Sequence, residues 1–120
     1  MTSPATPPLE RTLYRIATRA DWAAAEARGT YLGAAHDARD GFIHLSAPGQ
    51  VEGTLAVHYP DRAGLVLLEI DAEAIGATVK FEPSRKGELF PHLYGALPVA
   101  AVRRVLDIPA EGPALRGSSA

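Results

Sequence analysis

Five short hydrophobic segments, separated by turn-forming residues and not by long helices, constrain the fold of this chain most strongly. Their aliphatic, aromatic and β-branched residues are typical of β-strands. The segments are TLYRI (12–16), GFIHL (41–45), LVLLEID (65–71), TVKFE (78–82) and LFPHLYG (89–95). Because long helices do not alternate with these strands, the sequence predicts a single α+β domain and not a doubly wound parallel sheet.

Capping signals predict two helices between these strands. Thr18 opens the first helix, and Gly29 ends it. Ser46 is expected to cap a second helix over residues 48–58, with Pro60 ending it.

Three other segments give weaker signals. Residues 30–41 are polar and rich in glycine, so they are predicted to form a loop with at most one short strand. Residues 72–75 predict a short helical turn. Residues 99–108 fit either a closing helix or a pair of strands, and the sequence leaves this choice open.

Residues 11–109 are expected to form the domain, between a flexible leader (1–10) and a flexible tail (110–120) rich in proline, glycine or small residues.

Composition limits the classes of function. The net charge of −2, without a dense basic block, disfavours binding to duplex nucleic acid. The absence of cysteine excludes disulfides and a thiol nucleophile. No signal peptide or membrane-spanning run is evident, so a cytoplasmic protein is expected, with no prediction of its oligomeric state.

Two similar motifs, FIHLS and FPHLY, place a histidine in the middle of a predicted strand. Alternate residues of a strand share a face, so Phe42 lies beside His44, while Phe90 and Tyr94 lie beside His92. This pattern predicts the wall of a binding cleft, with rings for stacking and imidazoles for hydrogen bonding or proton transfer. The alternative is that each histidine is a structural core group bonded to the backbone.

The HDARDG segment upstream contains further polar residues. His36, Asp37 and Asp40 are typical of turns, although Asp40 could instead orient His44 or bind a polar ligand group. His36, Asp37, His44 and His92 have the side-chain chemistry of metal ligands, but their spacing matches no standard zinc or iron site, so no metal is expected.

Several isolated residues are candidates for ligand contacts. Ser46 and Gln50 lie at the start of the second predicted helix, where an anion would be favoured. Glu82 could bind a ribose hydroxyl or stabilise a developing cation. Arg15 could pair with Glu82 or meet a phosphate, although a surface position is expected, and His58 is expected to have no chemical role.

The motifs DGFIHLSAPGQV, LVLLEID, KFE and FPHLYGALPVAAV resemble, in this order, the bacterial family called domain of unknown function 952. The likeness extends to LYRI and DWAAAEARGTYLG and covers residues 13–105. That family is in turn distantly similar to the ADP-ribosyltransferase superfamily, which includes the NAD-dependent RNA 2′-phosphotransferases. The resemblance implies a split β-sheet or barrel whose cleft holds NAD.

Carried over by position, this resemblance makes Arg15 the first-strand residue of such a site. His44 and Ser46 fall on the middle strand, and Glu82 or His92 takes the late position. The chain departs from the superfamily pattern, because it has no clear His-Tyr-Glu or Arg-Ser-Glu set and lacks the late Glu-x-Glu of many transferases.

Three hypotheses follow for the cleft. In the first, a nucleotide or phosphorylated ligand such as NAD binds there for ADP-ribosyl- or phosphotransferase-like chemistry. His44 and His92 then contact ribose or phosphate or move a proton, Ser46 and Gln50 bind an anion, and Glu82 stabilises charge at the anomeric carbon. In the second, the cleft binds a ligand or a protein without catalysis. In the third, the histidines are structural and function lies elsewhere.

Overall fold

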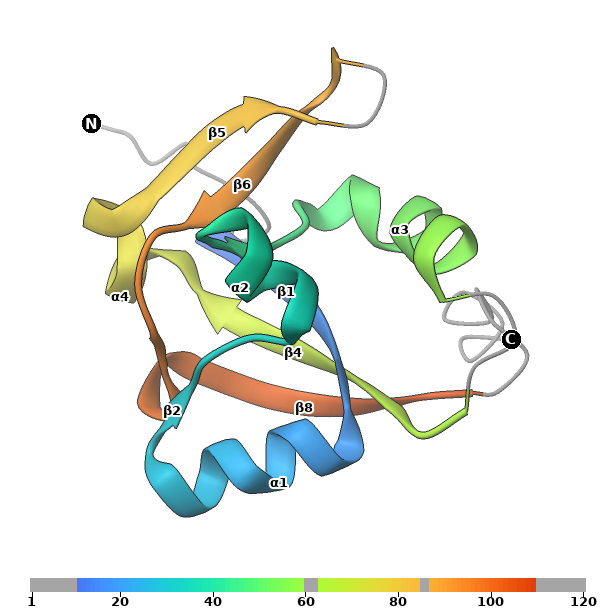
Figure 1. Cartoon of the computed structure of the whole chain (residues 1–120), viewed down its shortest axis with the longest axis vertical. Coiled ribbons are helices and arrows are strands. Elements are labelled where there is room, and N and C mark those ends of the chain that lie inside the picture. Colours follow the sequence, from blue (N-terminus) through green and yellow to red (C-terminus); the bar gives the residue numbers. More distant parts are fainter. Residues whose placement is uncertain (1–10, 60–62, 85–86, 110–120) are drawn as a thin grey trace.

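The fold consists of antiparallel strands and short helices, which confirms the predicted α+β class (Figure 1). The computed structural model describes residues 11–59, 63–84 and 87–109. The predicted leader and tail, and the predicted helix stop at Pro60, lie outside the described residues. No helix in the described part of the chain is long and apolar enough to span a membrane.

The central sheet has the strand order β1-β4-β8, and both strand pairs are antiparallel. Its strands are β1 (Thr12–Thr18), β4 (Leu65–Asp71) and β8 (Val102–Ile108). The LVLL run of β4 is buried because this middle strand has a hydrophobic cluster on each face of the sheet. The closing segment, which the sequence left open, is a 3-10 turn (Val99–Ala101) followed by the single strand β8.

A second sheet, with the order β3-β6-β5, carries the two histidine motifs. Its strands are β3 (Ile43–His44), β6 (Leu89–Leu93) and β5 (Val79–Pro83), and a separate pair joins β2 (Thr30–Tyr31) to β7 (Leu97–Pro98). The register places His44 directly opposite His92. Cross-strand partners point to the same face, so the two imidazoles are neighbours.

Helix α1 (Arg19–Arg28) confirms the first predicted helix. The Thr18 hydroxyl accepts the Asp21 N–H at 3.0 Å, and Gly29 ends the helix with a φ of 94°. Trp22 and Ala25 bury one face of this helix against the larger hydrophobic cluster. A four-residue helix, α4 (Ala72–Ile75), matches the predicted turn and runs into a 3-10 turn (Gly76–Thr78).

The second predicted helix starts later than expected, and Ser46 does not cap it. A 3-10 turn (Pro48–Gln50) precedes α3 (Val51–His58). The Ser46 backbone instead exchanges two hydrogen bonds of 2.8 Å with Tyr14 of β1. This bridge ties the chain after β3 to the central sheet, and α3 packs across the smaller hydrophobic cluster of that sheet.

The prediction of a loop at residues 30–41 was wrong in part, because the segment contains the helix α2 (Ala35–Asp40). The Asp37 side chain accepts the Ala34 N–H at 2.6 Å, and Gly41, with a φ of 88°, ends the helix. The sequence signals of this segment are those of turns. The helix depends on tertiary partners of Asp37, which local patterns do not reveal.

Gly33→Ala should lower the free energy of unfolding more than Gly41→Ala. Both glycines have positive φ values, of 91° and 88°, so either alanine strains the backbone, at a cost of about 1–3 kcal/mol. A Cβ at Gly33 would also lie 2.8 Å from the Asp37 Cβ, whereas one at Gly41 meets no described atom within 4 Å. We expect an extra loss of about 1 kcal/mol or more at Gly33 in urea unfolding. Equal losses would contradict this.

Candidate functional site

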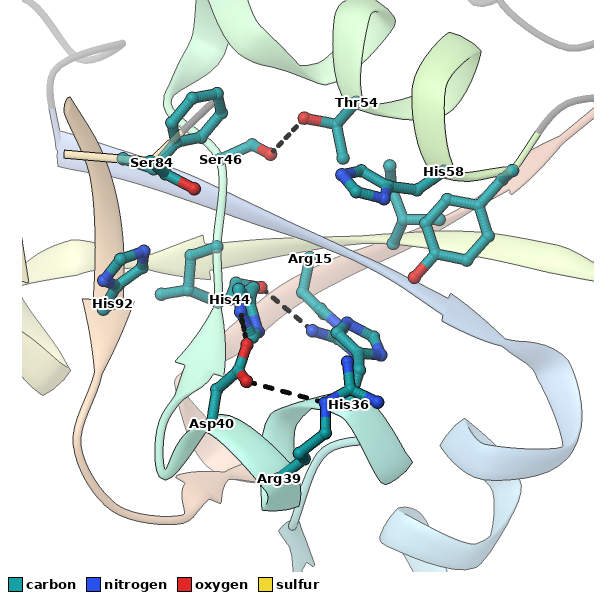
Figure 2. A pocket seen from close by; sticks show the side chains of 14 residues that line it. Arg15, His36, Arg39, Asp40, His44, Ser46, Thr54, His58, Ser84 and His92 are labelled. Atoms are coloured by element: carbon teal, nitrogen blue, oxygen red, sulfur yellow. Dashed lines mark hydrogen bonds and ion pairs between the residues drawn. The ribbon is translucent and has the colours of Figure 1, made fainter. Parts of the chain in front are cut away.

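A cavity of about 420 Å³ is lined by all four histidines of the chain (Figure 2). His36 comes from α2, His44 from β3, His58 from the end of α3 and His92 from β6. The ring centroids of His44 and His92 lie 5.7 Å apart. The volume is in the range of small-molecule sites, so the histidine motifs meet at a hollow that a ligand can fill.

A buried ion pair lies beneath the cavity. The Arg15 Nη1 donates to Asp37 Oδ1 at 2.8 Å, and Nη2 donates to Oδ2 at 2.7 Å. The two side chains are only 3% and 1% exposed. Arg15 was expected at the surface or paired with Glu82, and both expectations were wrong, because Asp37 takes the guanidinium in a bidentate pair.

Asp37 also accepts hydrogen bonds from three other groups. The backbone N–H of Ala34 lies 2.6 Å from Oδ2, and the backbone N–H of His44 lies 2.9 Å from Oδ1. The Nδ1 of His44 is 2.7 Å from the same Oδ1. Burial alone would raise the pKa of Asp37, but the hydrogen bonds from His44 and Arg15, with the Arg15 charge, hold it well below its ordinary range. Asp37 is therefore an anion at neutral pH.

His44 is held by carboxylates at both ring nitrogens. Its Nδ1 faces Asp37, and its Nε2 lies 2.9 Å from Asp40 Oδ2. Asp40 thus has the orienting position that the sequence suggested for it. Carboxylates only accept hydrogen bonds, so a neutral ring can satisfy one of these contacts and a doubly protonated ring satisfies both.

His92 has one anchored and one unpartnered nitrogen. Its Nδ1 lies 2.7 Å from Glu82 Oε1, which also accepts the Tyr94 hydroxyl at 2.7 Å. Its ring stacks on Phe42 with centroids 4.0 Å apart, and the residue is 4% exposed. Its buried Nε2 has no hydrogen-bond partner among the described residues. The hydrogen bonds from His92 and then Tyr94 lower the pKa of Glu82.

The cluster of His36, Asp37 and His44 is the one set of potential metal ligands found in the described part of the chain, with ligand atoms within 4.8 Å of one another. The set fits a metal ion poorly. The Asp37 oxygens already accept five donors, two of them from Arg15, and the His44 Nδ1 is one of the five. A metal would have to displace this buried network.

Five of the remaining predicted site residues fall into two groups. Ser46 and Phe90 line the cavity. Glu82, Tyr94 and Phe42 do not line it and instead form contacts around His92.

Gln50 lies apart from the histidines. Its Oε1 accepts the Ala47 N–H at 2.9 Å, and its Nε2 donates to the Glu88 carboxylate and the Leu89 carbonyl. The amide is engaged with the start of the α3 segment and with β6, and it does not line the cavity. The structure therefore does not bring Gln50 together with the predicted anion site.

Sequence reasoning missed several cavity residues. Thr54 and His58 lie one turn apart on α3, and Arg39 extends from α2. The i, i+4 spacing of Thr54 and His58 was visible, since such residues share a helix face. Which face would meet the cavity was not visible, because it depends on how α3 packs across β1.

Asp37→Asn should lower the free energy of unfolding by about 3–5 kcal/mol, because it leaves the buried Arg15 charge without its anion. The matched control Asp40→Asn, at a half-exposed carboxylate, should change it by about 1 kcal/mol or less. Urea unfolding measures both variants. The contribution of Asp37 to the free energy of unfolding is fully present above the ordinary pKa of an aspartate. It is lost as the pH falls toward the lowered pKa that Asp37 has in the folded protein. Similar losses in the two variants would argue against the buried pair.

Tyr94→Phe should raise the pKa of Glu82 toward its ordinary value. The substitution removes one of the two hydrogen bonds that lower this pKa and leaves the larger contribution, from His92, in place. Carboxyl ¹³C NMR titration measures the shift. The pKa of Glu69, which is lowered by Arg104, serves as an internal control and should not move. An unchanged Glu82 pKa would mean that the Tyr94 contact is absent in solution.

The comparisons with known proteins give a family but no activity. The family model described as "Protein of unknown function (DUF952)" matches residues 16–105. A crystal structure of protein CC0527 from Caulobacter crescentus is 47% identical, with a TM-score of 0.78 over 84% of this chain and 90% of that chain. An NMR structure of CC0527 is 45% identical, with a TM-score of 0.77 over 92% and 97% of the two chains. No curated protein matches. The chain therefore belongs to the DUF952 family of proteins of unknown function.

Proposed function

We propose that the four-histidine cavity binds a nucleotide-class ligand, with NAD as the first candidate, for transfer chemistry of the ADP-ribosyltransferase type. One observation carries the proposal. Three buried side-chain polar atoms have no hydrogen-bond partner among the described residues, and two of them, Arg15 Nε and His92 Nε2, belong to residues that line this cavity. Buried polar atoms are rarely left unpaired, so a polar ligand at this wall would complete the site.

The lining groups suit a phosphorylated sugar. Ser46, Thr54 and Ser84 contribute hydroxyls, and Arg39 contributes a positive charge at 3.7 Å from Asp40. Burial lowers the pKa of His36, which keeps its imidazole neutral and able to accept as well as donate a hydrogen bond. Such a mixture of hydroxyls, imidazoles and one guanidinium recognises hydroxyl and phosphate groups together.

The order of elements also supports this proposal. In the ADP-ribosyltransferase-like arrangement implied by the sequence resemblance, two sheets border the NAD cleft. Here β1 of the central sheet and β3 and β6 of the second sheet all contribute to the cavity wall. By their order along the chain, the resemblance assigns Arg15 to the first position, His44 and Ser46 to the middle strand, and Glu82 or His92 to the late position; of the last two, His92 lines the cavity.

The proposed roles of two residues change with the geometry. Glu82 does not line the cavity and its Oε1 is shared by His92 and Tyr94, so we assign it to holding His92 and not to a ligand's anomeric carbon. Both Nη atoms of Arg15 donate to Asp37, and Nη1 also donates to the His44 carbonyl, so Nε is the nitrogen of this side chain that has no partner among the described residues.

Isothermal titration calorimetry with NAD, ADP-ribose and nicotinamide mononucleotide tests the proposal. We expect binding, and we expect His92→Phe to weaken it about 5-fold, because this change preserves the stacked ring and removes one hydrogen bond worth about 1 kcal/mol. The control Arg103→Gln, on β8 and outside the cavity lining, should leave the affinity unchanged. Absence of heat with all three nucleotides would refute the nucleotide proposal.

Mass spectrometry of the NAD reaction mixture separates catalysis from binding. Release of nicotinamide would support transferase chemistry. Binding without release would favour the non-catalytic module, an alternative supported by one observation: Asp40, the carboxylate in the described cavity lining, is already hydrogen-bonded to His44. Unchanged binding in His92→Phe would instead indicate that this histidine is structural.

A further inference from the structure

The two nitrogens of His92 differ in what they can do. Nδ1 lies 2.7 Å from Glu82 Oε1, and a carboxylate oxygen only accepts hydrogen bonds. Nδ1 must therefore carry a hydrogen to make this contact. The Tyr94 hydroxyl donates to the same oxygen, so Oε1 is held from two directions.

The other nitrogen, Nε2, is buried without a partner among the described residues. A hydrogen on Nε2 would be a buried donor with no acceptor, whereas a lone pair there leaves only an unused acceptor. Buried polar hydrogens without acceptors are among the rarest defects in folded proteins. The favoured form of the ring thus has its hydrogen on Nδ1 and its lone pair on Nε2.

His44 provides the contrast. It lies opposite His92 in the sheet and also has a carboxylate, that of Asp37, at its Nδ1. Its Nε2, however, already has a hydrogen-bond partner, Asp40 Oδ2, at 2.9 Å. Of this cross-strand pair, only His92 has a free second nitrogen within the described structure.

We propose that His92 Nε2 is the proton acceptor of the cavity, and that Glu82 is the positioning residue that sets its tautomer. The ligand group that meets Nε2 is then a donor, a hydroxyl of ribose or of an attacking alcohol or water, and not a phosphate oxygen. The assignment of the ligand rests on the proposed function, whereas the tautomer does not. A donor at Nε2 is a more specific prediction than the one from sequence, in which the histidines could contact either ribose or phosphate.

In a transfer from NAD, one carbon–oxygen bond forms, one carbon–nitrogen bond breaks and one proton moves to His92. The hydroxyl oxygen of the acceptor forms a bond to the anomeric carbon, and its proton moves to His92 Nε2. The bond from that carbon to the nicotinamide ring nitrogen breaks, and its electron pair stays on the nitrogen, which becomes neutral. The imidazolium formed is stabilised through Nδ1 by the Glu82 carboxylate and later releases its proton to water.

Long-range ¹H–¹⁵N correlation spectra of protein labelled with ¹⁵N-histidine test the tautomer directly at neutral pH, with the His92 signals assigned by their loss in His92→Phe. We expect a protonated Nδ1 and an unprotonated Nε2. Glu82→Ala removes the oxygen that accepts from both Nδ1 and Tyr94, so the hydrogen is no longer held on Nδ1 and the ring signals should shift toward a mixture of the two neutral tautomers.

Asp40→Asn is the matched control, because it alters the partner of the neighbouring histidine and should leave the His92 pattern unchanged. A wild-type spectrum with the hydrogen on Nε2, or a Glu82→Ala spectrum identical to that of the wild type, overturns the proposal. Because Glu82 lies on an edge strand and its side chain is 35% exposed, the variant should fold, and its circular dichroism spectrum checks this.

A binding measurement completes the test. ADP-ribose should bind Glu82→Ala about 5-fold more weakly than wild type, since the lone pair on Nε2 is then no longer fixed toward the ligand's donor, while Arg103→Gln, outside the cavity lining, should bind as the wild type does. If no nucleotide binds but the spectra show the expected tautomer, the proposed function fails and the proton-acceptor assignment stands. If nucleotides bind and the tautomer is reversed, this inference alone fails.

Discussion

The buried ion pair between Arg15 and Asp37 connects three of the elements that line the cavity. Arg15 lies on β1, Asp37 on α2, and both contact β3 at one residue, His44. The Asp37 carboxylate accepts the backbone N–H and ring Nδ1 of His44, and Arg15 Nη1 donates to the His44 carbonyl. Backbone and side chain of this histidine are therefore fixed by the same pair of charges. Its position relative to the central sheet follows from this contact.

Burying such a network of charges carries a desolvation cost that offsets much of the stability its hydrogen bonds contribute. Two charges are removed from water, and hydrophobic residues of similar size often stabilise a core at least as well. The clearer effect of this network is on geometry, because it fixes the position of β3. β3 is only two residues long, so its ladder with β6 gives few hydrogen bonds to set its register and orientation. The polar contacts of Asp37 supply this missing constraint, and the tight approach of Gly33 to the same carboxylate allows α2 to lie close enough to make them.

Local patterns in the sequence predicted what local physics determines. The residue types of the strand segments predicted the strands, and Thr18 and Gly29 predicted the ends of the first helix. Both helix ends are set by hydrogen bonds within one turn, so they can be recognised from local sequence. The proximity of the histidines was predicted from two matched motifs. The Arg15–Asp37 pair was not, since its members are 22 residues apart and an aspartate in HDARDG has the local signature of a turn residue. For the same reason α2 was missed: it forms around a side chain whose partners come from elsewhere in the chain.

The two histidine motifs are alike in sequence and in strand position, yet their chemical environments differ. The difference arises from the carboxylates that reach them from neighbouring elements. Helix α2 supplies two carboxylates to His44, Asp37 at Nδ1 and Asp40 at Nε2, whereas β5 supplies only Glu82 to His92. A repeated motif therefore sets where the imidazoles lie, and the unrepeated elements around it set which ring nitrogen is available. Of these two imidazoles, only His92 has a ring nitrogen without a partner among the described residues, so a proton acceptor drawn from this pair is His92 Nε2 unless Asp40 is displaced from His44.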